Sequence, residues 1–600
     1  MPSPLRRPRT ALRNIAFSCA LIAAGLVFLP SQASAQESET ATTSPQNRFG
    51  ERIDVRVVNV DVYVTDRKGN RISGLTQADF ELEVDGEEVP ISNFYAETGG
   101  RVNERVQPIE RRSDTEFTPI EEVTVASDRR AHVVILIDHT RLQPANRAKA
   151  FKVLREAVAT LDDEDLVAVV GVEGSLVFYS DFLYDRKAVG EILDDVQDLS
   201  FDVPLGEIQR REIFGLLARG QSGGFLARAS TNIEGADVLQ RIQVYANEEF
   251  HRSMRSMGQI EAVVSTLGGI KGRKALFYVG EGIPQRPGEG LFVEWRNRFG
   301  GNDENAEMGV RRIDFNNDYT RAVGRFDLTD RMQRSADVAN RAGVTVYAID
   351  AEGNHGGKIR TALTEQGSTS EAVSVVDENF RAPLEFTTKA TGGKLLRSSG
   401  TLSEQLGDML QDFDTYYSLG FIAPDDWQVG AEYDIDVKVN KRRMRVRHRE
   451  KFRLPEPGER EGSATVTALM YDTVDNPLGI KATPGSEAPR EDGTAALPIL
   501  LEIPVGQLDL VPQEQTHALS VTLYVSIKDK EGNPGPVQKI PFHLEIPNDK
   551  VEEAKQHSAH YSVPLVLRPG DRQVAIGVRD DLSGRLSTLR IDVEAYSQAL

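Results

Sequence analysis

The stretch VVILIDHTRL, residues 133–142, places three side chains that could do chemistry directly after an apolar run. Asp138, His139 and Thr140 offer a carboxylate, an imidazole and a hydroxyl. The apolar run predicts a buried parallel strand whose carboxyl end delivers Asp138 to a crevice. Two interpretations follow. Asp138 is either the first ligand of a divalent metal site, since hard cations prefer oxygen, or a cap of the helix that comes next.

Other kinds of catalytic site are not indicated by the sequence. The only cysteine is Cys19, in an apolar stretch near the N-terminus, so a processed chain would hold no disulfide, thiolate nucleophile or cysteine-ligated zinc. The sequence contains no Gly-x-Ser-x-Gly and no His-Glu-x-x-His, and its nine histidines show no zinc-ligand spacing. We therefore expect a protein that is not an enzyme.

Two further segments could form a binding surface, one because it is strongly basic and the other because its composition is typical of a loop. RRMRVRHREKFR at 442–453 alternates basic with other residues, which predicts either an electropositive ladder on a strand or a solvated edge strand protected by like charge. Residues 282–328 are rich in Gly, Asn and charge, so they are either a specificity loop beside the sheet or disordered. Within them DFNNDYT has calcium-loop spacing, but Tyr319 and Arg325 replace the required Gly and Glu.

The first 35 residues are typical of a secretory signal. A basic start precedes IAFSCALIAAGLVFLP, and ASA at 33–35 fits the small-residue cleavage rule. The alternative is an uncleaved anchor, but this stretch is shorter than the roughly 20 residues that span a bilayer. We expect a secreted or periplasmic protein that meets a membrane only through this segment if it is uncleaved. With 71 basic and 91 acidic residues, the net charge of −20 argues against nucleic-acid binding.

The elements that must position Asp138 are those of an α/β domain. Residues 36–51 are a polar linker, residues 52–97 predict β strands, and residues 98–130 are a second polar linker. From 131 to 415 strand and helix patterns alternate, which predicts a parallel sheet covered by helices. The strands predicted over 416–455 are the natural partners of residues 52–97, so the α/β domain would be inserted into a small β-sandwich. The alternative is two separate β modules.

The last part of the chain, residues 462–600, predicts about seven strands, beginning with ATVTALMYD. That number and the turn signals between the strands are typical of an immunoglobulin-like β-sandwich. The expected fold class is therefore an α/β doubly wound sheet combined with β-sandwich domains.

The ordered set DVYVTDRKGNRISGLTQADFELEVDG, VVILIDHT, GRKALFYVGEGIP, ANRAGVTVYAID, TGGKLL and DTYYSLGF resembles the bacterial VWFA-related domain family described from Acidobacteria. The resemblance covers roughly residues 52–455. It implies a von Willebrand factor A-like doubly wound sheet with its first strand at the centre, and binding rather than catalysis.

The resemblance also implies a metal ion-dependent adhesion site for Mg²⁺ or another divalent cation, left open for a partner's carboxylate. Asp138 and Thr140 match its first two positions, but the third falls on Leu142, which has no oxygen. Glu281 stands where the fourth-strand Asp is expected, and Thr231 is the best match to a threonine in a later loop. The site is thus either functional or degenerate. For each residue a structural role, such as capping or a turn hydroxyl, is the alternative.

We expect a secreted or envelope-associated protein that binds a protein or matrix partner through the carboxyl-edge loops of the sheet. If a metal is bound, the partner should present an acidic residue. The alternatives are a non-catalytic accessory subunit of an envelope hydrolase or peptidase system, and a structural component of the envelope.

Overall fold

The computed structural model describes residues 57–98, 101–106, 130–201, 205–219, 227–299, 315–355, 370–397, 402–568, 570 and 573–593. The predicted signal segment 1–35 and the linker 36–51 lie outside these residues. No helix among the described residues is both long and apolar enough to cross a bilayer.

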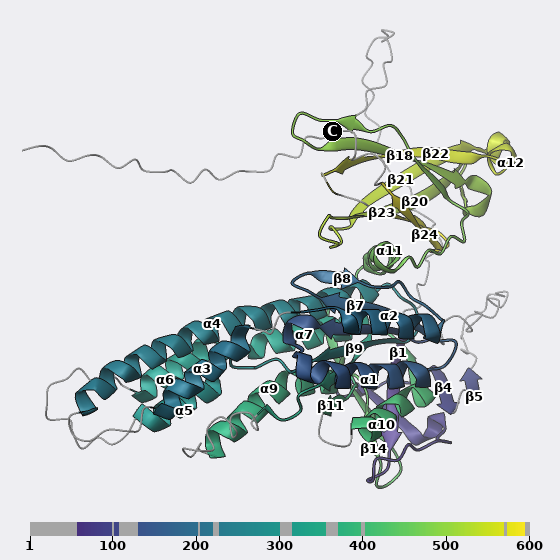
Figure 1. Cartoon of the computed structure of the whole chain (residues 1–600). Coiled ribbons are helices and arrows are strands. Elements are labelled where there is room, and N and C mark those ends of the chain that lie inside the picture. The colour runs from purple at the N-terminus through teal and green to yellow at the C-terminus, as the bar shows by residue number, and fades with distance from the viewer. Residues whose placement is uncertain are drawn as a thin grey trace, which may run out of the picture. The chain divides into compact units, whose positions relative to one another are not determined.

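A six-stranded sheet forms the centre of the α/β domain, in the order β11-β10-β9-β6-β7-β8 (Figure 1). Its strands are β6 (His132–Asp138), β7 (Leu166–Val172), β8 (Leu176–Phe178), β9 (Lys274–Gly280), β10 (Val344–Asp350) and β11 (Leu395–Arg397). All neighbours are parallel except β8, which runs antiparallel to β7. The first strand of the domain, β6, is central, as predicted for a doubly wound sheet. Asp138 therefore ends at the middle of the carboxyl edge.

Helices cover both faces of this sheet because its strands are apolar on both sides. One face packs against α1 (Pro144–Thr160), α2 (Arg186–Asp198) and α10 (Leu402–Asp414). The other packs against α4 (Ala227–Leu267), α7 (Thr329–Ala342) and α9 (Ser370–Ala390). The first core includes Ile135 and Phe151, and the second includes Leu136 and Val263, so alternate residues of β6 serve opposite faces.

A helical extension is built on the α/β domain. It consists of α3 (Leu205–Arg219), part of α4, α5 (Glu289–Phe299) and α6 (Phe315–Arg325), around a core with Trp295 at its centre. Residues 289–299 and 315–325 were expected to belong to a loop or to be disordered. They form helices instead, because Leu291, Phe292 and Trp295 of α5 are buried against α4.

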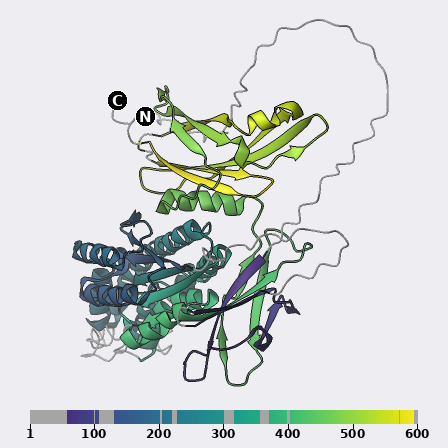
Figure 2. The same ribbon diagram turned by 90° about the vertical axis from the view of Figure 1, so that its right-hand side faces the viewer.

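Strands from both flanks of the α/β domain pair with one another. The first sheet contains β1 (Val57–Thr65), β4 (Asn93–Thr98), β5 (Arg101–Val106), β12 (Thr415–Ile422) and β14 (Arg445–Arg447). The second contains β2 (Phe80–Val84), β3 (Glu87–Glu88), β13 (Glu432–Val439) and β15 (Lys451–Arg453). The predicted linker from residue 98 is wrong over 101–106, which pairs with β4 as a hairpin. Figure 2 shows these strands in purple and green.

The basic stretch 442–453 does not form one strand. β14 pairs with β1, whereas β15 pairs with β13 in the other sheet. Arg443 adopts a φ of 70°, in the left-handed region, which breaks any continuous ladder of arginines. Arg447 and Arg453 instead make internal ion pairs with Asp412 and Glu459. The ladder interpretation is therefore wrong.

The C-terminal part begins with a helix rather than the expected strand. Residues of ATVTALMYD belong to α11 (Glu459–Tyr471), and its buried Leu469, Met470 and Tyr471 join the α/β core. Beyond it lies one sheet of β16 (Lys481–Pro484), β17 (Ala488–Pro489), β18 (Ala495–Pro504) and β22 (Ser558–Leu567). The other is β19 (Val511–Pro512), β20 (Thr516–Lys528), β21 (Gln538–Pro547), β23 (Gln573–Asp580) and β24 (Leu586–Asp592). The two sheets share one apolar core.

Candidate functional site

Asp138 lies at the carboxyl edge with its side chain fully buried. Its Oδ1 accepts hydrogen bonds from the Thr140 backbone N–H at 3.1 Å and from the Thr140 hydroxyl at 2.6 Å. Its Oδ2 accepts a hydrogen bond from the Tyr278 hydroxyl at 3.0 Å. Asp138 is the N-cap of the short 3-10 helix His139–Arg141, so it fulfils the structural role that was the alternative to metal binding.

Glu281 follows β9 and is also engaged within the protein. Its Oε1 accepts hydrogen bonds from the Gln143 backbone N–H at 2.8 Å and from the Asn146 side-chain amide at 2.9 Å. Gln143 is the N-cap of α1, so the carboxylate stands at the positive end of that helix. Glu281 therefore ties the loop after β9 to the start of α1.

Arg141 is the functional residue that sequence reasoning missed. Its guanidinium is buried and pairs with Glu249 of α4, with Nη1 2.8 Å from the carboxylate oxygen Oε1. It also donates to the hydroxyls of Ser253 and Ser256, each at 2.9 Å, and to the Gly282 carbonyl at 3.4 Å. Burial alone would lower the pKa of Arg141, but Glu249, Tyr278 and Asp138 outweigh this and raise it. The site thus contains a permanent positive charge of the protein's own.

These residues do not fit a divalent ion. Asp138 and Thr140 are bonded to each other, and Leu142 offers no oxygen at the third position. Thr231 lies within helix α4, not in a loop, and its side chain is outside the described ones. Among the residues that the structure describes, no group of three or more His, Cys, Asp or Glu side chains could hold a metal. The buried Arg141 guanidinium adds a positive charge to this edge, so a divalent cation would meet repulsion.

His139, beside Asp138, is buried. Its ring stacks on Phe201 with centroids 4.0 Å apart, and Nδ1 lies 2.9 Å from Arg147 Nη1. Burial, and secondarily the charge of Arg147, lower the pKa of His139 to about 3. The imidazole is therefore neutral at physiological pH and acts as an acceptor for Arg147.

A second cluster lies at the end of β10, and sequence reasoning did not identify it. His355 Nε2 is 3.1 Å from Asp350, and its Nδ1 is 3.3 Å from Glu352. The ring stacks on Phe380 with centroids 4.5 Å apart. Burial alone would lower the pKa of His355, but hydrogen bonds to the two carboxylates outweigh it and raise the pKa to about 9. The sequence signal was an Asp-x-Glu-x-x-His spacing after a strand.

A small pocket of about 60 Å³ lies at the carboxyl edge between these clusters, as lined by the described residues. Thr140, Arg141, Glu281 and His355 line it together with Arg210, Glu249 and Arg252 of the helical extension. Ligand cavities of enzymes usually measure about 300–1,000 Å³. Among the described residues, the edge is thus a set of buried side chains joined by hydrogen bonds and ion pairs, with room for a few waters.

Comparisons with known proteins add little to this geometry. No protein-family model matches the sequence, and neither does any curated protein. Among solved structures the chain is similar to "von Willebrand factor type A from Catenulispora acidiphila", at 10% identity over 86% of this chain and 72% of that chain, with a TM-score of 0.18. At this TM-score the likeness carries no argument, so the doubly wound fold is established here by its strand order.

The substitution Arg141→Met should destabilise the protein by roughly 1–3 kcal/mol, because the buried Glu249 carboxylate keeps only Arg252 as a counter-charge and the Ser253 and Ser256 hydroxyls lose a donor. The double variant Arg141→Met/Glu249→Gln should recover part of that loss, since it removes both charges. Urea unfolding followed by tryptophan fluorescence reports on this region, because Trp295 is buried in the helical extension. An Arg141→Met protein as stable as the wild type would contradict the charge-balancing role.

Titration with Mg²⁺ or Mn²⁺ at millimolar concentration should give no saturable heat. The oxygens of Asp138 are already bonded within the protein, and Arg141 opposes a second cation. Isothermal titration of the wild type beside Asp138→Ala tests this point. Saturable binding that disappears in the Asp138→Ala protein would restore the metal site.

Replacement of His355 by Gln should cost stability at low pH and less at high pH. The folded-state pKa of about 9 exceeds the ordinary 6.5, so the stabilisation from protonated His355 is complete below pH 6.5 and is lost through pH 9. The melting temperatures of the two proteins should therefore converge between pH 6.5 and 9.5. A difference that stays constant over this range would show that His355 is not charged in the folded state.

Proposed function

We propose that this chain is a secreted or periplasmic, non-enzymatic binding protein with a von Willebrand factor A-like domain. It binds a protein or matrix partner through the surface formed by the carboxyl-edge loops and the helical extension α3–α6, without a bridging metal ion. The observation that carries this proposal is the closed state of the carboxyl edge, where Arg141 and Arg252 pair with Glu249, and where Asp138 accepts hydrogen bonds within the protein.

The size of the carboxyl-edge pocket supports binding rather than catalysis. About 60 Å³ is too small for an ordinary substrate, and its carboxylates are held by hydrogen bonds from Tyr278, Gln143 and Asn146. A general acid or base must reach the reacting atom within hydrogen-bond distance. Asp138, with no exposed surface, could not do so from its present position.

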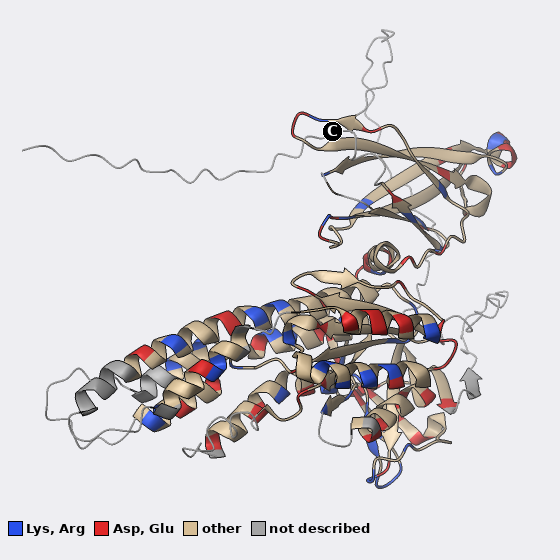
Figure 3. Ribbon diagram, in the orientation of Figure 1, with Lys and Arg blue, Asp and Glu red and all other residues tan. Residues whose placement is uncertain are grey.

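The helical extension supplies the exposed surface at this edge. It carries apolar side chains open to solvent, with Ile208 of α3 46% exposed and Val244 of α4 51% exposed. α3 and α4 are adjacent, since Gln209 Nε2 donates to Glu248 Oε2 at 2.8 Å. Basic and acidic side chains alternate along these helices in Figure 3. Mixed charge around isolated apolar side chains is typical of the polar rim and anchors of protein interfaces.

A photocrosslinking amino acid at Val244 or Ile208 should capture a common partner from the envelope fraction of the producing cells. The same amino acid at Leu500 or Val566 should not, although these strand residues of the C-terminal part are 41% and 44% exposed. Capture should be unchanged by EDTA, because no bridging metal is required. Equal capture at all four positions, or its loss in EDTA, would contradict the proposal.

A further inference from the structure

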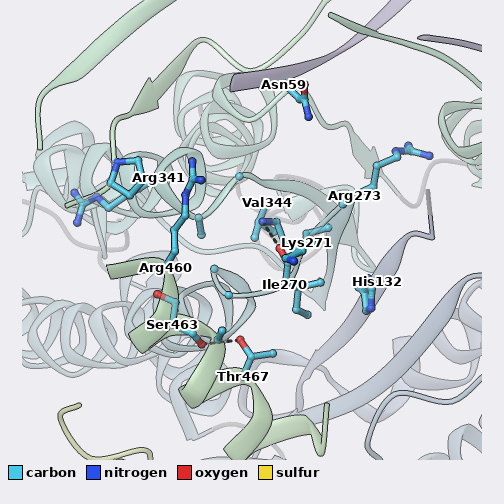
Figure 4. Close-up of a pocket in the computed structure, with 18 of the residues that line it drawn as sticks. Asn59, His132, Ile270, Lys271, Arg273, Arg341, Val344, Arg460, Ser463 and Thr467 are labelled. Carbon is cyan, nitrogen blue, oxygen red and sulfur yellow. Dashed lines mark hydrogen bonds between the residues drawn. The ribbon is translucent and has the colours of Figure 1, made fainter. Parts of the chain in front are cut away.

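A second and much larger cavity lies at the opposite, amino edge of the α/β sheet. Its volume is about 1200 Å³, and it is lined by β1, by the residues just before β9 and β10, and by the start of α11 (Figure 4). Asn59, His132, Lys271, Arg273 and Arg460 are among its labelled side chains. Cavities between packed parts of a chain are a usual place for small-molecule sites.

Some basic side chains of this cavity are already balanced by carboxylates. Arg273 lies 3.6 Å from Asp61, and Arg341 lies 3.6 Å from Glu432. Arg453 makes a two-pronged contact with Glu459, at 2.6 and 2.7 Å. Each of these three arginines therefore has its own carboxylate partner, and the pairs have a structural role.

Lys271, Lys274, Arg449 and Arg460, also in the cavity, form no ion pair with any residue that the structure describes, and the last three carry the argument. Lys274 Nζ donates only to the Ile270 carbonyl, at 3.0 Å, and Arg449 Nη2 to the Asn59 carbonyl, at 2.7 Å. Arg460 adds a third positive charge from the first turn of α11. The side chains of Lys274 and Arg449 are only partly exposed, so solvent compensates their charges incompletely.

Lys274 and Arg449 point toward the same space. Gly343, the left-handed residue that ends α7, has no side chain there, and a Cβ at this position would lie 3.5 Å from Arg449 Nη1 and 3.6 Å from Lys274 Nζ. The two cations thus converge from β9 and from the segment between β14 and β15. Two convergent donors of this kind match the oxygens of one anionic group.

We propose that this amino-edge cavity is a binding site for a small anionic molecule, whose phosphate or carboxylate group is held between Lys274 and Arg449 with Arg460 at the side. The site is separate from the carboxyl-edge surface, and this proposal does not depend on the proposed function. An anion would give Lys274 and Arg449 a directly bonded negative partner, since neither forms an ion pair with a described residue and Asp61 acts on them only at longer range.

The electrostatics of the cluster agree with this site. Burial, followed by the charges of Arg449 and Arg460, lowers the pKa of Lys274 to about 8. Burial likewise lowers the pKa of Arg449, while Asp61 raises it. A bound anion would relieve this repulsion and stabilise the folded protein in proportion to its occupancy.

Isothermal titration of the full-length protein with inorganic phosphate and, separately, with citrate tests the proposal, in chloride buffer at constant ionic strength. Saturable binding of either is expected, and the tighter of the two identifies the phosphate or the carboxylate as the preferred group. Lys274→Met and Arg449→Met should each weaken it about tenfold or more, as expected for the loss of one charge-assisted hydrogen bond. Lys274→Arg, which keeps the charge, should bind within a few-fold of the wild type.

The matched control is Lys152→Met, because Lys152 of α1 is a lysine with 72% side-chain exposure away from the cavity. It should leave binding unchanged. Melting curves separate binding from folding: without added anion, Lys274→Met should melt no lower than the wild type, because one repulsive charge is gone. Absence of saturable heat with both anions, or equal affinity in the wild type and both Met variants, would overturn the proposal.

Discussion

The buried guanidinium of Arg141 is the group on which the carboxyl edge depends. It joins the loop after β6 to the loop after β9 through Gly282, and both to α4 through Glu249, Ser253 and Ser256. The last three residues are spaced i, i+4 and i+7, so they share one face of the 41-residue helix. A buried cation therefore ties α4, and with it the helical extension, to these two loops. Leu142, the next residue, is apolar and buried in the core of the sheet.

The two edges of the sheet differ in how their buried charges are compensated. At the carboxyl edge, Arg141 balances buried acids and His355 is held between Asp350 and Glu352. At the amino edge, Lys274 and Arg449 converge on the space above Gly343 with no carboxylate in an ion pair with either among the described residues. A bound anion would offset the repulsion between these like charges in a partly buried cavity, whereas a closed ion-pair network has no need of an external partner. Small-molecule chemistry is thus expected at the edge opposite to the one that the fold class suggests.

The sequence predicted the parallel sheet better than it predicted the local exceptions. β-branched and apolar runs such as that before Asp138 identify the parallel sheet, since burial on both faces requires them. The same kind of composition led to the wrong prediction of a strand at ATVTALMYD, which lies in helix α11. There the hydroxyls of Thr465 and Thr467 donate hydrogen bonds to the carbonyls of Glu461 and Ser463, one turn earlier in the helix. The burial of Leu469 in the α/β core favours the helix and outweighs the intrinsic strand preference of these residues. Arg141 could not be assigned from sequence, because Glu249 lies far along the chain and only the fold brings them together.

Strand β9 runs from one edge of the sheet to the other, so it is the direct route by which binding at one edge could affect the other. β9 begins at Lys274 and ends at Gly280, immediately before Glu281, so the two charged side chains are about 20 Å apart along the strand. At an effective dielectric constant near 20, two unit charges at that distance interact by less than about 1 kcal/mol. The strand is almost wholly buried between two helical layers, and close-packed strands transmit little local displacement unless they have two alternative arrangements. An anion at the amino edge should therefore act locally, and partner binding at the other edge should proceed independently of it.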